Sequence, residues 1–394
     1  MIKINTDYSF ADCEKLIELC GTSQSQNAEL ELATNIRLAQ YPGGATSLAQ
    51  ALITWARRHE SPRLVIYAGA KGGEATIRKF TDRLHGLVAT MMASEVLATD
   101  RQTSVRKVAY SDARHRIENM NDGKLSETAR GVGTSLICVD HSSMGYLRPL
   151  YHNAEVENRL RGESDFFDLT QKILNASVPQ PHCKKITHQD TTAIAAILKE
   201  LFSNTHDHAR HDFNGRFYKK SVRGIHTVFH YVDPDRIDEV ACGLPMLAAY
   251  LKQHINGWRG QHLQFLELSV FDSGPGLATR ALQKPLVDLS LEEEISAVKR
   301  CFLKHVSSKE RSTDGLGLYR TMGLLKNRLG YIRLRTGRLS LCKSFPPESG
   351  GSTETELLPE DLQLVDGTNG NDEPEEMPSV DGVVVTILLP IGRA

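Results

Sequence analysis

Short apolar runs separated by amphipathic stretches dominate the first half of the chain. Residues 64–67 (LVIY) and 135–139 (SLICV) are apolar runs flanked by Gly, Asp and Ser, which is typical of buried strands. Between them, residues 75–98 carry apolar side chains at helical spacing, and a further helix is expected over 47–59. This alternation predicts a small α/β domain over residues 1–175.

Two changes in composition divide the rest of the chain. Residues 176–188 contain two prolines and little periodicity, so we expect a linker there, followed by a second domain over 189–394. Residues 344–380 carry ten acidic side chains and no Lys or Arg, a composition that predicts disorder. Because the strong β pattern of residues 382–390 follows, the acidic stretch is expected to be an insertion within the second domain.

The segment 191–212 begins as an amphipathic helix and places polar side chains on one face. Its apolar residues recur at i, i+3, i+4, i+7 and i+8, the pattern of a helix that packs on a core. Glu200, Asn204 and Asp207 then fall on a neighbouring face of the same helix. Solvated helix faces usually mix Lys and Glu, whereas this face presents carboxylates and an amide, groups that bind metal ions and water.

Two glycine-rich turns follow at the ends of predicted elements. Residues 263–271 have the pattern of a strand that ends at Asp272-Ser-Gly-Pro-Gly, so a carboxylate stands at the mouth of a core strand. The glycines after it allow a ligand to approach the backbone closely. Residues 312–318 (STDGLGL) precede a predicted helix over 319–329. Glycines just before a helix N-terminus expose N–H groups to an anion.

The order of these three motifs resembles the GHKL ATPase family, which includes gyrase-type topoisomerases, mismatch-repair ATPases, a major heat-shock chaperone and histidine kinases. The motifs are E-L-x-x-N-x-x-D on a helix, a strand ending in D-x-G-x-G, and G-L-G-L opening a helix about 40 residues later. The resemblance covers about residues 185–394. It implies that the second domain of the expected two-domain α/β protein is a Bergerat-type α+β sandwich, a mixed sheet covered by helices, with ATP and Mg²⁺ as cofactors.

The resemblance also implies a role for each motif residue. Glu200 matches the general base that polarises a water for attack on the γ-phosphate. Asn204 matches the amide whose oxygen holds Mg²⁺, and Asp272 matches the carboxylate that accepts a hydrogen bond from the adenine amino group. Asp207 corresponds to a second helix carboxylate that orients other groups. The nucleotide is expected to lie against the residues of the two glycine boxes, Gly274, Gly276, Gly315, Leu316, Gly317 and Leu318.

The stretch between the glycine boxes, residues 277–314, matches the lid that closes over ATP in this family. It contains a predicted charged helix over 289–305. Lys309 in this stretch is expected to reach the γ-phosphate when the lid closes, as lysines do in some family members. The alternative interpretation is a solvated lysine on a loop.

Charge and cysteine content exclude several classes of protein. The 47 Lys and Arg nearly balance the 48 Asp and Glu, so net charge predicts neither nucleic-acid nor membrane binding. No apolar run approaches the length of a membrane span, and seven scattered cysteines without a C-x-x-C pair fit reduced thiols. We therefore expect a cytoplasmic protein without a membrane partner. His206, His208 and His211 lie too close together on one helix to converge on a zinc ion.

The function expected from the resemblance is that of an ATP-gated switch. Lid closure in a Mg²⁺-dependent ATP hydrolase would change the N-terminal effector or receptor domain, or build a homodimer, and act on a partner protein encoded nearby. A protein kinase of the anti-sigma or histidine-kinase type and a nucleotide sensor without hydrolysis are the alternatives. A histidine kinase is disfavoured because the proline-bearing segment 176–188 stands where the phosphoacceptor helix would be.

Charge is unevenly placed near the C-terminus. Residues 299–343 carry twelve Lys or Arg against two acidic residues, and the acidic stretch 344–380 follows directly. One interpretation is that the basic side chains offset the ATP phosphates or are simply solvated. The other is that the acidic stretch folds back over the basic region and competes with an anionic partner, nucleic acid being one such partner.

Overall fold

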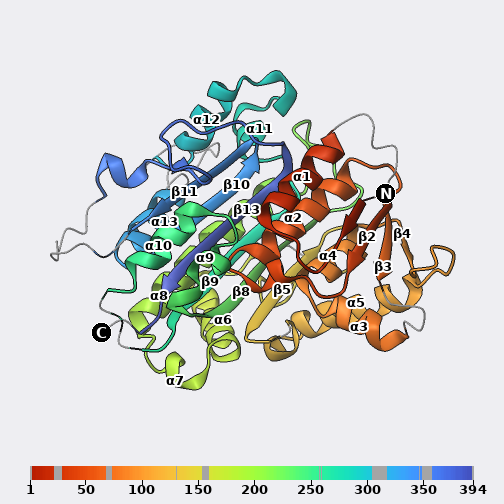
Figure 1. Ribbon diagram of the computed structural model, residues 1–394, viewed down its shortest axis with the longest axis horizontal. Helices are drawn as coiled ribbons and strands as arrows, with labels where there is room; N and C mark the ends of the chain where they lie inside the picture. The colour runs from red at the N-terminus through yellow and green to blue at the C-terminus, as the bar shows by residue number, and fades with distance from the viewer. Residues whose placement is uncertain are drawn as a thin grey trace.

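The computed structural model describes residues 2–21, 29–67, 73–129, 131–152, 159–256, 258, 260–303, 317–345, 347 and 357–392. Within these ranges, two large β-sheets are joined through a layer of helices (Figure 1). The mixed α/β character expected from the sequence is confirmed. None of the helices in these ranges combines the length and the apolar character that a membrane crossing requires.

The N-terminal residues form a parallel sheet of four strands. Its order is β1 (Ile2–Ile4), β2 (Glu29–Ala33), β3 (Arg63–Tyr67) and β4 (Glu95–Leu97). Parallel neighbours require crossover connections, and helices fill them: α1 (Phe10–Gly21), α2 (Gly44–Arg57), α3 (Glu74–Thr81) and α4 (Leu84–Met92). α5 (Arg106–Asn121) follows β4. We refer to residues 2–129 as the N-terminal module.

Two of the elements predicted for this module are confirmed, and one differs. The apolar run 64–67 lies in β3, and the helix predicted over 47–59 is α2. The single helix predicted over 75–98 is instead α3, α4 and the short strand β4. A Cβ on Gly86 would lie 1.9 Å from the carbonyl oxygen of Phe80, so only glycine allows α4 to turn back closely against the end of α3.

The second sheet has seven strands in the described residues, and every neighbouring pair is antiparallel. The strand order is β12 (Val365–Asp366), β11 (Leu339–Ser344), β10 (Tyr331–Gly337), β13 (Val380–Pro390), β9 (Leu263–Asp272), β8 (Val222–Val232) and β5 (Gly133–Val139). The strand predicted over 382–390 is therefore the central strand β13. The mixed strand directions that the resemblance implied are not found in this part of the chain.

The expected division at residues 176–188 does not separate the two sheets. β5, which lies within the predicted N-terminal domain, pairs with β8 from Gly133↔Val228 to Val139↔Val222. α6 (Glu163–Ser177) packs against α8 (His188–His208), and the expected linker contains the short helix α7 (Gln180–Cys183). The local pattern of residues 135–139 identified a strand but carried no information about its distant partner.

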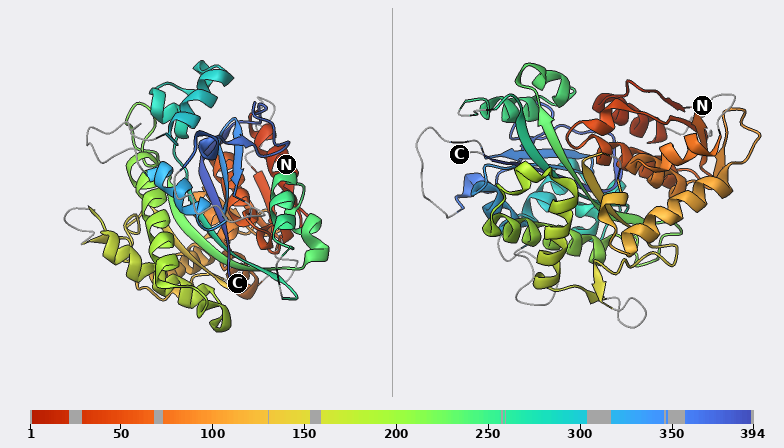
Figure 2. Two further views of the ribbon diagram at one scale, coloured as in Figure 1. Left: turned by 90° about the vertical axis from the view of Figure 1, so that its left-hand side faces the viewer. Right: turned by 90° about the horizontal axis from the view of Figure 1, so that it is seen from below.

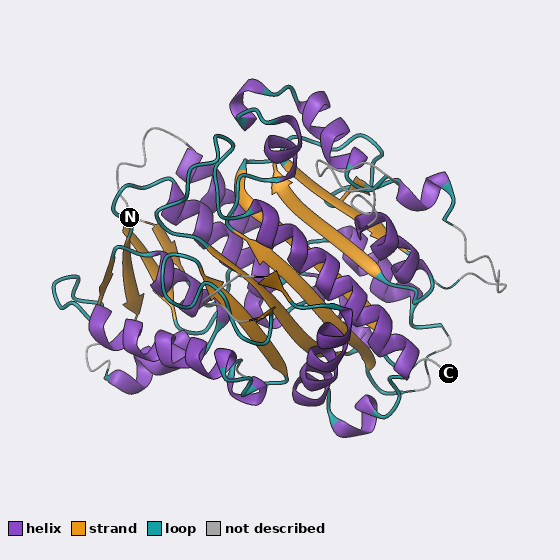
Figure 3. Cartoon of the chain, turned by 180° about the vertical axis from the view of Figure 1, so that it is seen from behind, coloured by secondary structure: helices purple, strands orange, loops and turns teal. Residues whose placement is uncertain are grey.

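Helices cover both faces of the seven-stranded sheet. α6 and α8 contact strands β8 and β5 or β9 on one face, and α13 (Gly317–Lys326) packs on α8. α2 contacts β13 and β9 from the other face. Figure 2 shows the sheet between the long helix α8 and the N-terminal helices, and Figure 3 shows from behind the helices that cross its strands. The remaining helices are α9 (Ile237–Ala241), α10 (Pro245–Gln253), α11 (Leu277–Leu282) and α12 (Leu291–Arg300).

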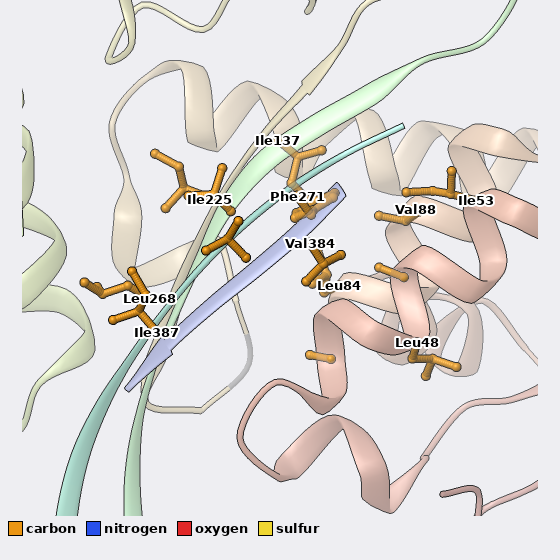
Figure 4. Close-up of a cluster of buried hydrophobic side chains, with 14 of the residues drawn as sticks. Leu48, Ile53, Leu84, Val88, Ile137, Ile225, Leu268, Phe271, Val384 and Ile387 are labelled. Atoms are coloured by element: carbon orange, nitrogen blue, oxygen red, sulfur yellow. The ribbon is translucent and has the colours of Figure 1, made fainter. Parts of the chain in front are cut away.

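One apolar core connects the N-terminal module with the seven-stranded sheet. Every residue of α2 from Gly44 to Ala56 is buried, as expected for a helix enclosed on all sides. Figure 4 shows side chains of α2 and α4, Leu48 and Val88 among them, beside Val384 and Phe271 of the sheet. The module therefore packs on the sheet through buried apolar surface, which stabilises the contact by roughly 25 cal/mol for each Å² removed from water.

The prediction of disorder over 344–380 is wrong for residues 357–380. This stretch contains a 3₁₀ turn (Pro359–Leu362) and β12, which pairs with β11. Asp366 is buried, and its carboxylate accepts hydrogen bonds from the backbone N–H groups of Thr368 and Glu375 at 2.6 and 2.8 Å. The acidic side chains thus satisfy turn N–H groups, an effect that composition alone does not reveal. Residues 348–356 lie outside the described ranges.

Candidate functional site

The helix α8 carries the first motif and starts at a well-defined cap. The hydroxyl of Thr187 accepts from the N–H of Asp190 at 3.1 Å, and the Asp190 carboxylate accepts from the N–H of Thr187 at 3.0 Å. This reciprocal capping box fixes the first turn. One side of the helix is buried on the sheet, whereas Glu200, Asn204 and Asp207 lie half-buried beside it. The predicted common face is therefore present.

The N-terminus of α13 lies against Glu200. A Cβ on Gly317 would stand 2.5 Å from Oε2 of Glu200, so glycine is the residue that allows this approach. The first N–H groups of a helix lack intrahelical partners and attract negative charge. The Glu200 carboxylate thus lies where the second glycine box opens its helix. Leu318, the next residue, packs partly against the core.

The turn after β9 lies against the other end of α8. A Cβ on Gly274 would stand 2.8 Å from Cα of Ala209 and 3.2 Å from the carbonyl oxygen of His208. The N–H of Gly274 donates to Oδ1 of Asp272 at 2.8 Å. Gly276 has a φ of 89°, a conformation that favours glycine, and directs the chain into α11. Both predicted glycines are therefore required by the backbone of this turn.

Gly274 of the first glycine box and Gly317 of the second contact α8 at two separate points. His208 is eight positions after Glu200, which corresponds to about 12 Å along a helix axis at 1.5 Å per residue. Asn204 lies midway between them on the same helix. The three motifs, distant in sequence, therefore meet along one helix, with a carboxylate at each end of the row.

Burial perturbs the carboxyl group of Asp272. Burial raises its pKa from the ordinary value of 3.8 to about 6, although N–H groups of Gly274 and Val383 and the positive charges of Arg223 and Arg57 act in the opposite direction. The side chain is only 7% exposed. Arg223 is itself neutralised by Asp140, whose Oδ1 lies 3.0 Å from its Nε. A buried acid that titrates close to neutral pH is typical of a functional site.

The centre of the row offers oxygen ligands but no complete metal cage. The Asn204 amide makes no hydrogen bond to a residue that the structure describes. Among the same described residues, no group of three or more His, Cys, Asp or Glu side chains is arranged to hold a metal ion. Mg²⁺ accepts such a site because it keeps several waters and takes few protein ligands. The nearby histidines have other contacts: His206 with the Tyr151 hydroxyl and His208 with Nε of Arg280.

The described part of the expected lid is anchored to the sheet. Glu294 of α12 is fully buried and accepts from both the N–H and Nε of Arg338, at 2.8 and 2.7 Å. The helix predicted over 289–305 is thus shorter, ending at Arg300. The predicted contact residues Lys309, Gly315 and Leu316 lie outside the described residues.

Sequence reasoning missed the contribution of the N-terminal module to this site. Arg57, the last residue of α2, donates to the carbonyl and hydroxyl oxygens of Ser273, between Asp272 and Gly274. The sequence signal that was available is a pair of arginines, Arg57 and Arg58, at the end of a helix that is otherwise uncharged.

Comparison with known proteins gives no independent assignment. No protein-family model, no curated protein and no solved structure matches the chain. The functional argument therefore depends on the three motifs and on their meeting along α8.

Proposed function

We propose that the chain binds ATP with Mg²⁺ along α8, between the turn after β9 and the N-terminus of α13, and hydrolyses it slowly. The observation that carries this proposal is the placement of both glycine boxes against the helix of Glu200 and Asn204. The seven-stranded sheet departs from the Bergerat-type sandwich in being antiparallel throughout its described strands, and shares with it only helices α6, α8 and α13 on one face, so the Bergerat-type fold is itself part of the proposal.

The end of β9 is proposed as the adenine site. The Asp272 carboxylate, ionised above about pH 6, accepts a hydrogen bond from the exocyclic amino group of adenine. Guanine carries a carbonyl oxygen at that position, and two acceptors facing each other in a buried site are unfavourable. The lack of side chains at Gly274 and Gly276 leaves the backbone of the turn open to the base and ribose.

The N-terminus of α13 and the face of α8 are proposed as the phosphate site. The first N–H groups of α13, which have no acceptor within the helix, would attract the phosphates. Glu200, half-buried beside that N-terminus, would orient a water and accept its proton at the carboxylate. Mg²⁺, held by the Asn204 amide oxygen and by water, would supply charge neutralisation. Asp207, one turn further along α8, would orient these waters.

The role of ATP is proposed to be that of a switch acting on the N-terminal module and a partner protein. The apolar contact between α2 and strands β9 and β13 supports this proposal, because any movement of the site reaches the module through packed side chains. ATP-dependent homodimerisation is a further route by which such a switch could act.

Phosphate release from the purified chain tests the proposal. Wild-type protein is expected to release phosphate from ATP only with Mg²⁺, and Glu200→Gln is expected to lower the rate by about 10²–10⁴-fold without loss of nucleotide affinity. Glu18→Gln, the same charge change on an exposed residue of α1, serves as the matched control.

Labelled γ-phosphate gives the second outcome of the same experiment. Label that accumulates on a protein instead of in free phosphate would replace the hydrolase proposal by a protein kinase. Identical phosphate release in wild type and Glu200→Gln would show that Glu200 is not the base.

A further inference from the structure

The C-terminal end of α2 contacts the turn that follows β9. Arg57 donates to the carbonyl oxygen of Ser273 and, at 3.2 Å, to its hydroxyl. The same hydroxyl accepts from the N–H of Val222 at 2.9 Å, so the end of β9 is held to the start of β8. A residue of the N-terminal module therefore fixes the peptide between Ser273 and Gly274, one residue beyond Asp272.

The segment between α8 and β8 holds Arg57 from another direction. The guanidinium carbon of Arg57 lies 3.3 Å from the centre of the Tyr218 ring, a close cation–π contact. Tyr218 follows the C-terminal end of α8, and its N–H donates to the carbonyl oxygen of Arg210. Arg57 thus connects the helix of the first motif with the turn of the second.

Arg58 makes a parallel set of contacts with β13. Its Nη2 donates to the carbonyl oxygen and hydroxyl of Ser379 at 2.6 and 2.8 Å, and its Nε lies 3.4 Å from Oδ2 of Asp381. The following residue, Gly382, donates to the carbonyl oxygen of Gly274 at 2.8 Å. A Cβ on Gly382 would lie 1.9 Å from the carbonyl oxygen of Asp272, so this strand backs the turn directly.

We propose that the N-terminal module regulates nucleotide affinity through Arg57, which positions the turn that presents Asp272 to adenine. The inference rests on the proposed function. A partner that binds the module and shifts α2 would withdraw Arg57 from Ser273 and loosen the adenine carboxylate. Arg57 is a positioning residue, because it contacts the backbone after Asp272 and not the nucleotide.

Charge gives this arrangement a measurable signature. Asp272 faces the positive charges of Arg57 on α2 and Arg223 on β8, which lower its pKa against the effect of burial. Arg57 in turn faces Tyr218, Asp381 on β13 and Asp140. Loss of the Arg57 charge should therefore raise the pKa of Asp272 and move the pH at which nucleotide binding is half-maximal upward.

Three variants separate positioning from charge. Arg57→Gln removes both the donors and the charge, so affinity for a non-hydrolysable ATP analogue should fall about tenfold or more at pH 7, and the pH midpoint should rise. Arg57→Lys keeps the charge but loses the planar guanidinium that stacks on Tyr218 and places Nη2 against Ser273, so affinity should fall while the midpoint stays near that of wild type. Arg63→Gln, a charge change elsewhere in the module, is the matched control and should behave as wild type.

Calorimetry between pH 5 and 8, with circular dichroism as the test of folding, decides the inference. The inference is overturned if the wild type binds the analogue and both Arg57 variants bind it with the same affinity and the same pH midpoint as the wild type. Absence of binding in the wild type would instead refute the proposed function. If Arg57→Gln does not fold, Arg57→Lys alone carries the comparison, since equal affinity in Arg57→Lys and Arg63→Gln also contradicts the inference.

Discussion

Asp272→Asn replaces a buried carboxyl by a neutral amide of nearly the same shape. The Oδ1 atom that accepts from the N–H of Gly274 is retained, and the neighbouring charges of Arg223 and Arg57 are unchanged. Because burial opposes ionisation at this position, the substitution should stabilise the folded protein above pH 6 while it removes the proposed acceptor for adenine. A gain in stability coupled to a loss of function is typical of functional sites.

The magnitude follows from the pKa of Asp272. Its rise from 3.8 to about 6, at about 1.4 kcal/mol for each tenfold change in acidity, corresponds to roughly 3 kcal/mol. The folded state holds its proton to a higher pH than the unfolded state, so wild-type stability falls as pH increases between about 4 and 6. Asp272→Asn should therefore gain up to roughly 3 kcal/mol of unfolding free energy above pH 6 and almost nothing below pH 4.

Glu267 provides a matched contrast on the same strand. This buried carboxylate accepts from His230 Nε2 at 2.8 Å, the Ser269 hydroxyl at 2.6 Å and the N–H of Gly43 at 3.0 Å. Hydrogen bonds from His230 lower its pKa although burial acts in the opposite direction. Glu267 therefore contributes stability at neutral pH that is lost as pH falls through its lowered pKa, and Glu267→Gln should destabilise by about 1–3 kcal/mol at pH 7.

Urea unfolding of wild type and both variants at several pH values between 4 and 8 measures these differences. The expected result is opposite signs at pH 7.5, with Asp272→Asn more stable and Glu267→Gln less stable than wild type. If Asp272→Asn is less stable than wild type by the same unfolding free energy at pH 4.5 and pH 7.5, burial of the Asp272 charge does not determine stability at this position.

Two further predictions concern the glycines and the acidic segment. Gly317→Ala should lower ATP turnover with little change in unfolding free energy, because its Cβ would displace the flexible end of Glu200. Gly274→Ala meets backbone instead and should cost about 1–3 kcal/mol; equal stability of the two variants in urea would contradict this distinction. Asp361→Asn removes a 2.8 Å ion pair with Lys326 of α13 and should raise turnover at low salt, where charge is least screened. If turnover is unchanged at both low and high salt, the acidic segment 357–380 has no influence on activity.

Local sequence patterns predicted those helices and strands that can be recognised without knowing which distant segments they pack against. Apolar runs located β3 and β13, and the helical period located α2 and the first turns of α8. The common face of Glu200, Asn204 and Asp207 followed from helix geometry alone. These features depend on residues within one or two turns of each other, so the sequence contains them directly.

Features that depend on distant residues were predicted poorly. The strand at 135–139 was identified, but its pairing with β8 places it in the other sheet. The acidic residues of 357–380 were predicted to be disordered because composition does not reveal that Asp366 binds three turn N–H groups. The Arg57-Arg58 pair at the end of a helix did not reveal its role, since the Arg57 partners Ser273 and Tyr218 lie more than 150 residues away in the sequence. Tertiary contacts of this kind are set by topology and not by local preference.

The proposal that Asp272 selects adenine in an ATP site is tested by measuring the binding of ATP and GTP analogues to the wild type as a function of pH. With Mg²⁺ present, we expect the adenine analogue to bind and the guanine analogue not to bind, and we expect affinity to increase with pH through a midpoint near 6 as Asp272 ionises. Asp272→Asn should remove both the selectivity and the pH dependence. Absence of binding at millimolar nucleotide, or equal affinity for the two analogues at every pH, would contradict the account.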